Sequence, residues 1–171
     1  NPVKMLQVET PAITERRLKL ELRLAQIQDL KSCRENFLHY VKKMWPDFIG
    51  GAHHTMIAKK FEDIATGKNK RLIINMPPRH TKSEFASYLF PSWIIGRAPK
   101  TIQTTHTAEL AVNFGRKVRN LLDTDIYNNV FEGVKLQADS KAAGRWSTNH
   151  GGEYFAAGVG GAITGRGADL L

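Results

Sequence analysis

The segment Arg71–Ser83, RLIINMPPRHTKS, decides the fold that we expect for this chain. Its apolar run from Leu72 to Met76 is typical of a buried parallel strand, and the residues after Lys82 are compatible with a helix. Lys82 and Ser83 would then lie at a helix N-terminus, where unpaired N–H groups and the helix dipole favour an anion. The lysine can reach the outer phosphates of a nucleotide, and the serine hydroxyl can ligate magnesium. The segment therefore predicts a nucleotide-binding loop.

The loop departs from the usual phosphate-binding pattern, GxxxxGK followed by Ser or Thr. Met76 stands at the first glycine position and Thr81 at the second, with Pro77–His80 between them. Because glycine tolerates backbone angles that other residues avoid, Thr81 has to adopt a less favourable conformation, or the loop differs in shape. The alternative is a structural strand, turn and helix in which Lys82 is a solvated helix residue.

Composition indicates one globular domain. The chain has 171 residues, of which 42% are hydrophobic, and this is enough to bury a core without disulfides. The single cysteine, Cys33, has no cysteine partner for a bridge or a zinc site, so we expect a packed thiol in a reducing compartment. The absence of a secretory leader and of a long apolar run predicts a soluble protein with no membrane partner.

The net charge of +9 and the pI near 9.8 point to a polyanionic partner, with nucleic acid as the first candidate. The alternative is a solvated basic surface without a partner, because the positive residues are spread along the chain rather than clustered. Charge does not separate DNA from RNA.

Helices are expected in the first part of the chain. Thr10 followed by Pro11 favours a helix start, and leucine and isoleucine residues follow at helical spacing up to Leu30. The alternation Leu18, Leu20, Leu22, Leu24 also permits a strand, but the residues between them favour a helix. Two further helices are predicted over Cys33–Trp45 and His53–Ala65.

The histidines at the start of the third predicted helix, His53 and His54, have no cysteine or carboxylate at ligand spacing. We therefore interpret them as helix-start packing or nucleotide contacts rather than as metal ligands.

Strands and helices are expected to alternate from Arg71 onward. The helix from Lys82 should end or kink at Pro91, a strand is predicted over Thr101–His106, and a helix over Ala108–Leu122. This order predicts an α/β fold with a mainly parallel sheet flanked by helices, and ligands at the carboxyl ends of the strands. Beyond Asp123 helix content should fall, with strands near Trp146 and over Glu153–Ala157.

Four blocks carry a resemblance to a known family: RLIINMPPRHTKSEFASYLFPSWIIGR, LAVNFGRKVRNLL, SKAAGRW and GGEYFAAGVGGAITGRGADLL. Together they resemble the N-terminal ATPase domain of the large terminase subunit of tailed bacteriophages, over 45–171. The resemblance implies a P-loop NTPase of the ASCE type, with a mainly parallel sheet flanked by helices. Residues 1–44 would form an N-terminal helical extension, and 45–171 the ATPase domain.

The implied activity is ATP hydrolysis that drives double-stranded DNA into a procapsid. Such motors form rings on the portal protein, work with a small terminase subunit, and act in the host cell cytoplasm. The family loop, often PPRxGKS, also lacks the first glycine, so Thr81 is the one departure. Lys82 carries over as the phosphate contact and Ser83 as the Mg²⁺ ligand. The ATP-binding residues would be Pro78, Arg79, His80, Thr81, Lys82, Ser83 and Glu84.

The resemblance also implies groups that lie beyond this sequence. In the family, the strand that begins at 168–171 continues into two acids, one that organises magnesium and one that activates water. Asp169 opens this strand and corresponds to neither acid. A nuclease domain of ribonuclease H type would follow. We therefore expect the chain alone to bind nucleotide better than it hydrolyses it.

Arg79, Arg145 and Arg166 are candidates for stabilising charge on the transferred phosphoryl group. Arg79 would sense the γ-phosphate, and Arg166 is the preferred finger toward a neighbouring subunit, because it lies between two glycines. The alternative for each arginine is a DNA-phosphate or surface contact. The glycine-rich segment Gly151–Gly167, which contains GVGGAITGRG, is either a tight structural loop or a support for catalysis or subunit contact.

Two other functions remain open at this point. One is a nucleic-acid helicase of the same P-loop class, which would separate strands rather than package DNA. The other is a non-catalytic basic DNA-binding or assembly adaptor, favoured by the missing glycines and acids.

Overall fold

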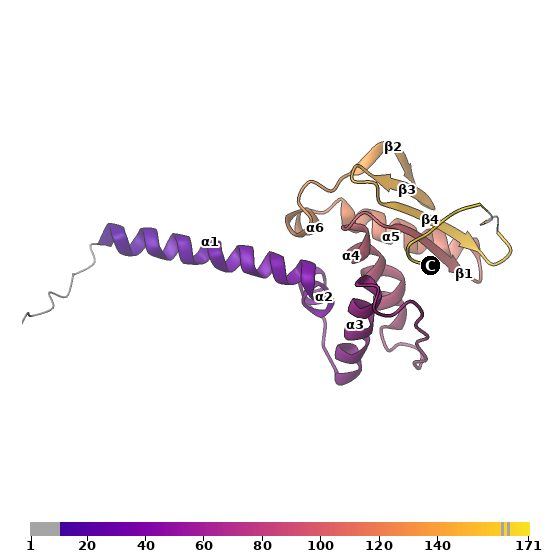
Figure 1. Ribbon diagram of the computed structural model, residues 1–171, viewed down its shortest axis with the longest axis horizontal. Coiled ribbons are helices and arrows are strands. Elements are labelled where there is room, and N and C mark those ends of the chain that lie inside the picture. The colour runs from indigo at the N-terminus through magenta and orange to yellow at the C-terminus, as the bar shows by residue number, and fades with distance from the viewer. Residues whose placement is uncertain (1–10, 162, 164) are drawn as a thin grey trace, which may run out of the picture.

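The computed structural model describes residues 11–161, 163 and 165–171. The helical elements are α1 (Pro11–Glu35), α2 (Phe37–Met44), α3 (Ala52–Ala65), η1 (Glu84–Leu89), α4 (Phe90–Ile95), α5 (Ala108–Leu122) and α6 (Asp125–Val130). The strands are β1 (Lys100–Thr105), β2 (Leu136–Ala142), β3 (Arg145–Thr148) and β4 (Glu153–Gly158). Figure 1 shows a long N-terminal helix attached to a body of helices and one sheet. Among the described helices, none combines the length and the apolar character that a bilayer span requires.

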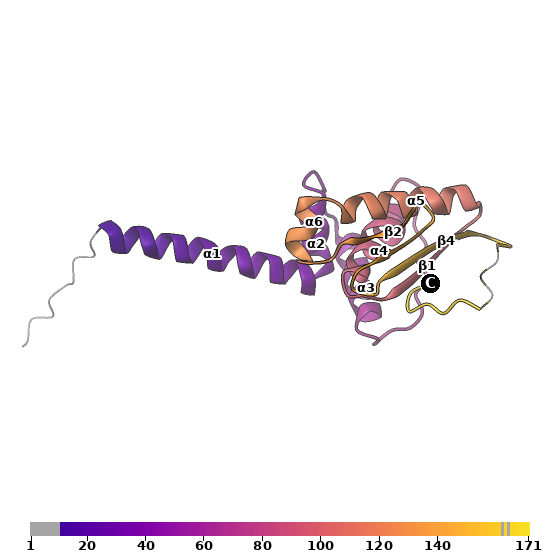
Figure 2. The same cartoon turned by 90° about the horizontal axis from the view of Figure 1, so that it is seen from above.

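Helix α1 extends away from the rest of the chain in both views (Figures 1 and 2). Only Cys33, near its C-terminal end, is buried, whereas six large apolar side chains are more than half exposed. The prediction of an N-terminal helix is confirmed for the described residues, and its proposed cap, Thr10, lies outside them. The expected helix over Cys33–Trp45 begins later, because the Asn36 side chain accepts a hydrogen bond from the His39 N–H and caps α2.

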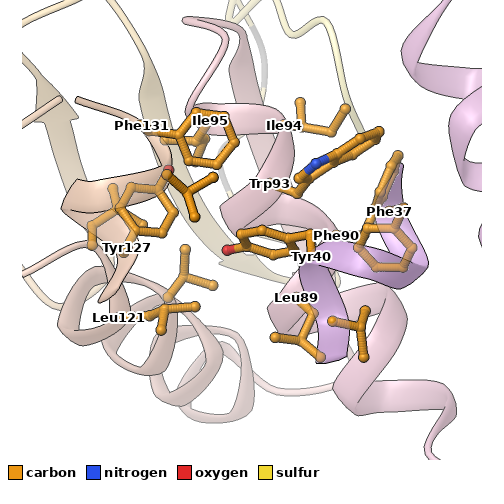
Figure 3. Packing of buried hydrophobic residues seen from close by; sticks show 14 of the residues in the cluster. Phe37, Tyr40, Leu89, Phe90, Trp93, Ile94, Ile95, Leu121, Tyr127 and Phe131 are labelled. Atoms are coloured by element: carbon orange, nitrogen blue, oxygen red, sulfur yellow. The ribbon is translucent and has the colours of Figure 1, made fainter. Parts of the chain in front are cut away.

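Aromatic side chains fill the centre of the helical body. The Phe37 ring of α2 lies 5.3 Å from Phe61, 5.6 Å from Phe85, 5.6 Å from Phe90 and 5.4 Å from Trp93, measured between ring centroids. Figure 3 shows several of these residues packed between α2 and α4. Most of these pairs meet edge to face, the arrangement that aromatic quadrupoles favour. The core thereby fixes the helix that follows Lys82.

The helix after Lys82 continues to Ile95, but one turn is widened. The Phe90 N–H donates to the Phe85 carbonyl, five residues earlier, so residues 84–89 form a π-helical turn. Pro91 follows this turn and has no N–H to donate. Pro91 therefore lies directly after the widened turn, and the helix continues past it to Ile95.

The sheet corrects the expected fold class. Its strand order is β1-β4-β3-β2, and only β1 and β4 are parallel, while β4 with β3 and β3 with β2 are antiparallel. The prediction of a mainly parallel P-loop sheet is therefore wrong. The short connections between β2, β3 and β4 are the physical reason, because a parallel pair needs a long crossover. Strands β3 and β4 were predicted from sequence, whereas β2 was not, because LQADSKA is largely polar.

The apolar run Leu72–Met76 also differs from its prediction, since these residues form no strand in the described structure. Leu72 and Ile74 are half-buried against the core, whereas Ile73 is 86% exposed. The segment is thus extended with one apolar side on the helical core. An apolar run is compatible with packing of one side on a core as well as with a buried strand, so the sequence pattern did not separate the two structures.

Helix α5, predicted with the same bounds, packs on one face of the sheet. The Trp146 ring stacks on Tyr154 with centroids 4.9 Å apart, and the Trp146 Nε1–H donates to the Gly115 carbonyl of α5. At the outer edge of β1, Leu170 forms a parallel bridge with Thr101. The chain therefore returns from β4 to the far side of β1 (Figure 2).

Candidate functional site

The loop before the helix has strained backbone at two positions. Arg79 has φ 63° and Thr81 has φ 60°, which is the left-handed region that non-glycine residues rarely adopt. The expectation that Thr81 takes an unfavourable conformation in place of glycine is confirmed. The Phe85 N–H donates to the Thr81 carbonyl at 2.9 Å and closes the first helical turn. The N–H groups of residues 82–84 precede this bond and lie at the open end of the helix.

A chain of hydrogen bonds holds Thr81 in place. The Gly51 N–H donates to His54 Nδ1 at 2.9 Å, and His54 Nε2 lies 2.7 Å from Thr81 Oγ1. The Thr81 hydroxyl donates in turn to the His80 carbonyl at 2.6 Å. Because Nδ1 accepts the hydrogen bond from Gly51 and the Thr81 hydroxyl proton is directed to the His80 carbonyl, Nε2–H must be the donor to Thr81. The neutral Nε2–H tautomer of His54 therefore anchors the loop to α3.

The environment of His54 favours this neutral form. Burial lowers the pKa of His54 below its usual value, and the nearby charges that His53 and His80 can carry lower it further. The His53 and His54 rings are 3.8 Å apart, and the Phe48 and Phe85 rings also contact His54. Of the two histidines singled out in the sequence, His54 is thus a packing residue that supports the candidate loop.

The residues predicted to contact nucleotide lie on the surface. Lys82, Ser83, Pro78, Arg79 and His80 are exposed. The Lys82 ammonium and the Ser83 hydroxyl are therefore accessible to a ligand at the helix N-terminus. Figure 1 shows this helix beginning at the end of the loop that follows α3.

Glu84 differs from its neighbours, because its carboxylate is already bound. Lys117 of α5 approaches both oxygens, with Nζ–O distances of 2.7 and 2.5 Å. The same ammonium lies 4.5 Å from the centre of the Tyr88 ring. Sequence reasoning missed Lys117, because nothing in its local sequence indicates which residue on η1 it meets. The pair ties the start of the helix to α5 and leaves Glu84 less available to a cofactor.

Arg145 and Arg166 lie elsewhere. Both line a cavity of about 670 Å³ beside the sheet, together with residues from all four strands. None of residues 78–84 lines this cavity. The structure therefore brings the two arginines together and does not bring them to Lys82 within one chain.

A possible metal group at the junction of α1 and α2 contains Asp29, Cys33 and His39. His39 Nε2 lies 2.7 Å from Asp29 Oδ1, and Lys43 Nζ lies 2.6 Å from Asp29 Oδ2. Hydrogen bonds from Lys43 and His39 lower the pKa of Asp29, whereas burial raises the pKa of the Cys33 thiol to about 11. A protonated thiol and a carboxylate held by an ammonium are poor ligands, so this group fits a structural clamp between two helices.

Comparisons of the chain with protein-family models, with curated proteins and with solved structures give no match. The functional proposal consequently depends on the loop, its supports and the chemistry of the exposed residues.

Proposed function

We propose that this chain binds the phosphates of ATP at Arg79–Ser83 and serves as the ATPase domain of a terminase-like DNA-packaging motor. The observation that carries the proposal is the strained loop, in which two non-glycine residues with positive φ lead directly into an open helix N-terminus. Backbone strain of this kind costs roughly 1–3 kcal/mol per residue and is concentrated at ligand sites.

The chemistry of the exposed groups supports a phosphate ligand. The N–H groups of the first helical turn carry partial positive charge, and Lys82 adds a full charge that can reach the outer phosphates. Ser83 offers one hydroxyl oxygen to Mg²⁺, a cation that keeps several waters and takes further oxygens from the nucleotide. Magnesium would neutralise charge on the phosphates when it is bound. Arg79, with its exposed guanidinium beside Thr81, is the candidate for the γ-phosphate.

The support for the proposal comes from the loop and the sequence, and not from the mixed sheet. Strand order provides no support for the motor, so the proposal depends on the loop geometry and on the sequence resemblance. Translocation of double-stranded DNA, assembly into a ring on a portal and procapsid, contact with a small subunit, and action in the host cell cytoplasm are parts of the same proposal.

A second candidate function is a non-catalytic DNA-binding or assembly adaptor. The Glu84–Lys117 pair favours it, because one of the polar side chains at the loop is occupied within the chain. The two functions differ in whether the wild-type chain binds ATP at all.

The direct test is the affinity for ATP with Mg²⁺, measured by titration calorimetry on the wild type and on Lys82→Ala. Loss of one charge-assisted phosphate contact should weaken binding by about tenfold or more. Lys42→Ala is the matched control, because Lys42 is an exposed helix lysine on α2, away from the loop. Equal affinity of Lys82→Ala and the wild type would reject the site. No ATP binding by the folded wild type would favour the adaptor.

A further inference from the structure

We infer that the face of the sheet opposite α5 binds the backbone phosphates of nucleic acid through Arg145 and Arg166. The surface is the cavity of about 670 Å³ that both arginines line. This site is separate from the loop at Arg79–Ser83, and it depends on the proposed function only in the choice of nucleic acid as the ligand.

Strand register places Arg145 on this face. Arg145 pairs with Phe155, and Trp146 pairs with Tyr154, across the antiparallel β3 and β4. Because successive side chains alternate between faces, Trp146 and Tyr154 point to α5, and Arg145 and Phe155 point the other way. Arg145 is exposed and Phe155 is half-buried. Arg145 and Phe155 are thus cross-strand neighbours on the face of the sheet opposite α5.

Arg166 reaches the same ring from the segment that returns from β4 to the edge of β1. Its guanidinium carbon lies 4.0 Å from the centre of the Phe155 ring. At this distance the ring attracts the cation and restricts the orientation of the side chain. The Arg166 N–H also donates to the Ile163 carbonyl at 3.1 Å, which closes a turn before the terminal bridge. Arg166 therefore contacts the ring of Phe155, and Arg145 is the cross-strand neighbour of the same phenylalanine.

The lining carries three cations, Lys100, Arg145 and Arg166, and two carboxylates, Asp139 and Glu153, so it is net positive by one charge. Lys100 and Glu153 pair with each other at 3.3 Å, and Asp139 also lines the cavity. Among the described residues, neither Arg145 nor Arg166 has a carboxylate oxygen within 4.0 Å. Two guanidinium groups without a carboxylate partner in the lining of one cavity leave positive charge there, which a bound anion would neutralise.

A phosphate is the anion that this arrangement fits best. The planar fork of a guanidinium can donate two parallel hydrogen bonds to phosphate oxygens. The chain carries a net charge of +9, which favours a long polyanion over a small ion by attraction at a distance. Ser140 and Ser147, which also line the cavity, can donate further hydrogen bonds to phosphate or sugar oxygens.

Fluorescence anisotropy with a short labelled DNA duplex tests the inference on the full chain at several salt concentrations. Arg145→Ala and Arg166→Ala should each weaken duplex binding by about tenfold. Each should also make the negative slope of the log association constant against log salt concentration shallower by about 0.9. Arg23→Ala, which removes an exposed arginine of α1, is the matched control and should leave both values near those of the wild type. Arg166→Lys keeps the charge and should recover the slope but only part of the affinity.

Free nucleotide is the other source of phosphate, and a parallel titration with ATP distinguishes it. The two arginine variants should bind ATP as the wild type does, and Lys82→Ala should bind the duplex as the wild type does. Unchanged duplex affinity and salt slope in both arginine variants, with wild-type melting temperatures, would overturn the inference. Loss of ATP binding by the two arginine variants, with duplex binding unchanged, would also overturn it. Neither of these outcomes affects the proposed role of Lys82.

Discussion

His54 of α3 donates its Nε2–H to the hydroxyl of Thr81, 2.7 Å away, and so fixes the backbone of the loop before the helix. The histidine is 5% exposed, and its other ring nitrogen accepts the Gly51 N–H. The bond joins two elements that are distant in sequence. It also explains how a threonine with φ 60° is held where glycine would be the usual residue.

Removal of the Thr81 hydroxyl should destabilise the protein. Thr81→Ala keeps a β-carbon in the left-handed region and leaves the His54 Nε2–H without its partner, so we expect the free energy of unfolding to fall by about 1 kcal/mol. Urea unfolding of the wild type, Thr81→Ala, His54→Ala and the double variant measures the coupling between the two side chains. Strictly additive losses would show that the hydrogen bond contributes nothing.

Stability should fall on mild acidification because of His54. Its pKa is lowered in the folded state, so the unfolded chain binds the proton more tightly, and stability rises with pH between the folded pKa and about 6.5. The contribution is complete above about pH 6.5 and is lost as the pH falls through the folded value. Unfolding experiments from neutral to mildly acidic pH should show a steeper loss for the wild type than for His54→Gln. His150→Gln, at an exposed position in the β3 to β4 connection, is the control and should follow the wild type.

Gly115 controls how closely α5 approaches the sheet. A β-carbon at this position would lie 2.6 Å from the Ala143 carbonyl oxygen and 2.8 Å from the Tyr154 ring. Gly115→Ala should therefore lower the free energy of unfolding by about 1–3 kcal/mol, despite the better helix propensity of alanine. Gly50→Ala is the control, because its β-carbon would meet only the Phe48 ring at 3.5 Å. Equal melting temperatures of the two variants would contradict this account of the packing.

Helices α3 and α5 were predictable because their signals are local, whereas α6, over Asp125–Val130, was not predicted. The 3.6-residue spacing of apolar residues in 108–122 gave α5 with its observed bounds, and the spacing in 53–65 gave α3 within one residue. The steric cost of placing a threonine at the glycine position of the loop was also predictable, since the cost of a β-carbon at positive φ depends on one residue alone. The Asn36 cap that separates α1 from α2 was a weaker local signal and was missed.

The sequence by itself determined that Lys82 and Ser83 stand at the beginning of a helix, because short-range sterics and hydrogen bonding decide where a helix starts. It left open whether Thr81 is strained or the loop has another shape, and the structure shows the strained backbone. Only the tertiary structure decided the mixed order of the sheet, the position of Leu72–Met76 on the helical core and the partners His54 and Lys117. It also placed Arg145 and Arg166 in the lining of one cavity, with Arg166 against the Phe155 ring. These features depend on which distant segments meet, and local residue spacing does not identify the partner of a strand or of a side chain.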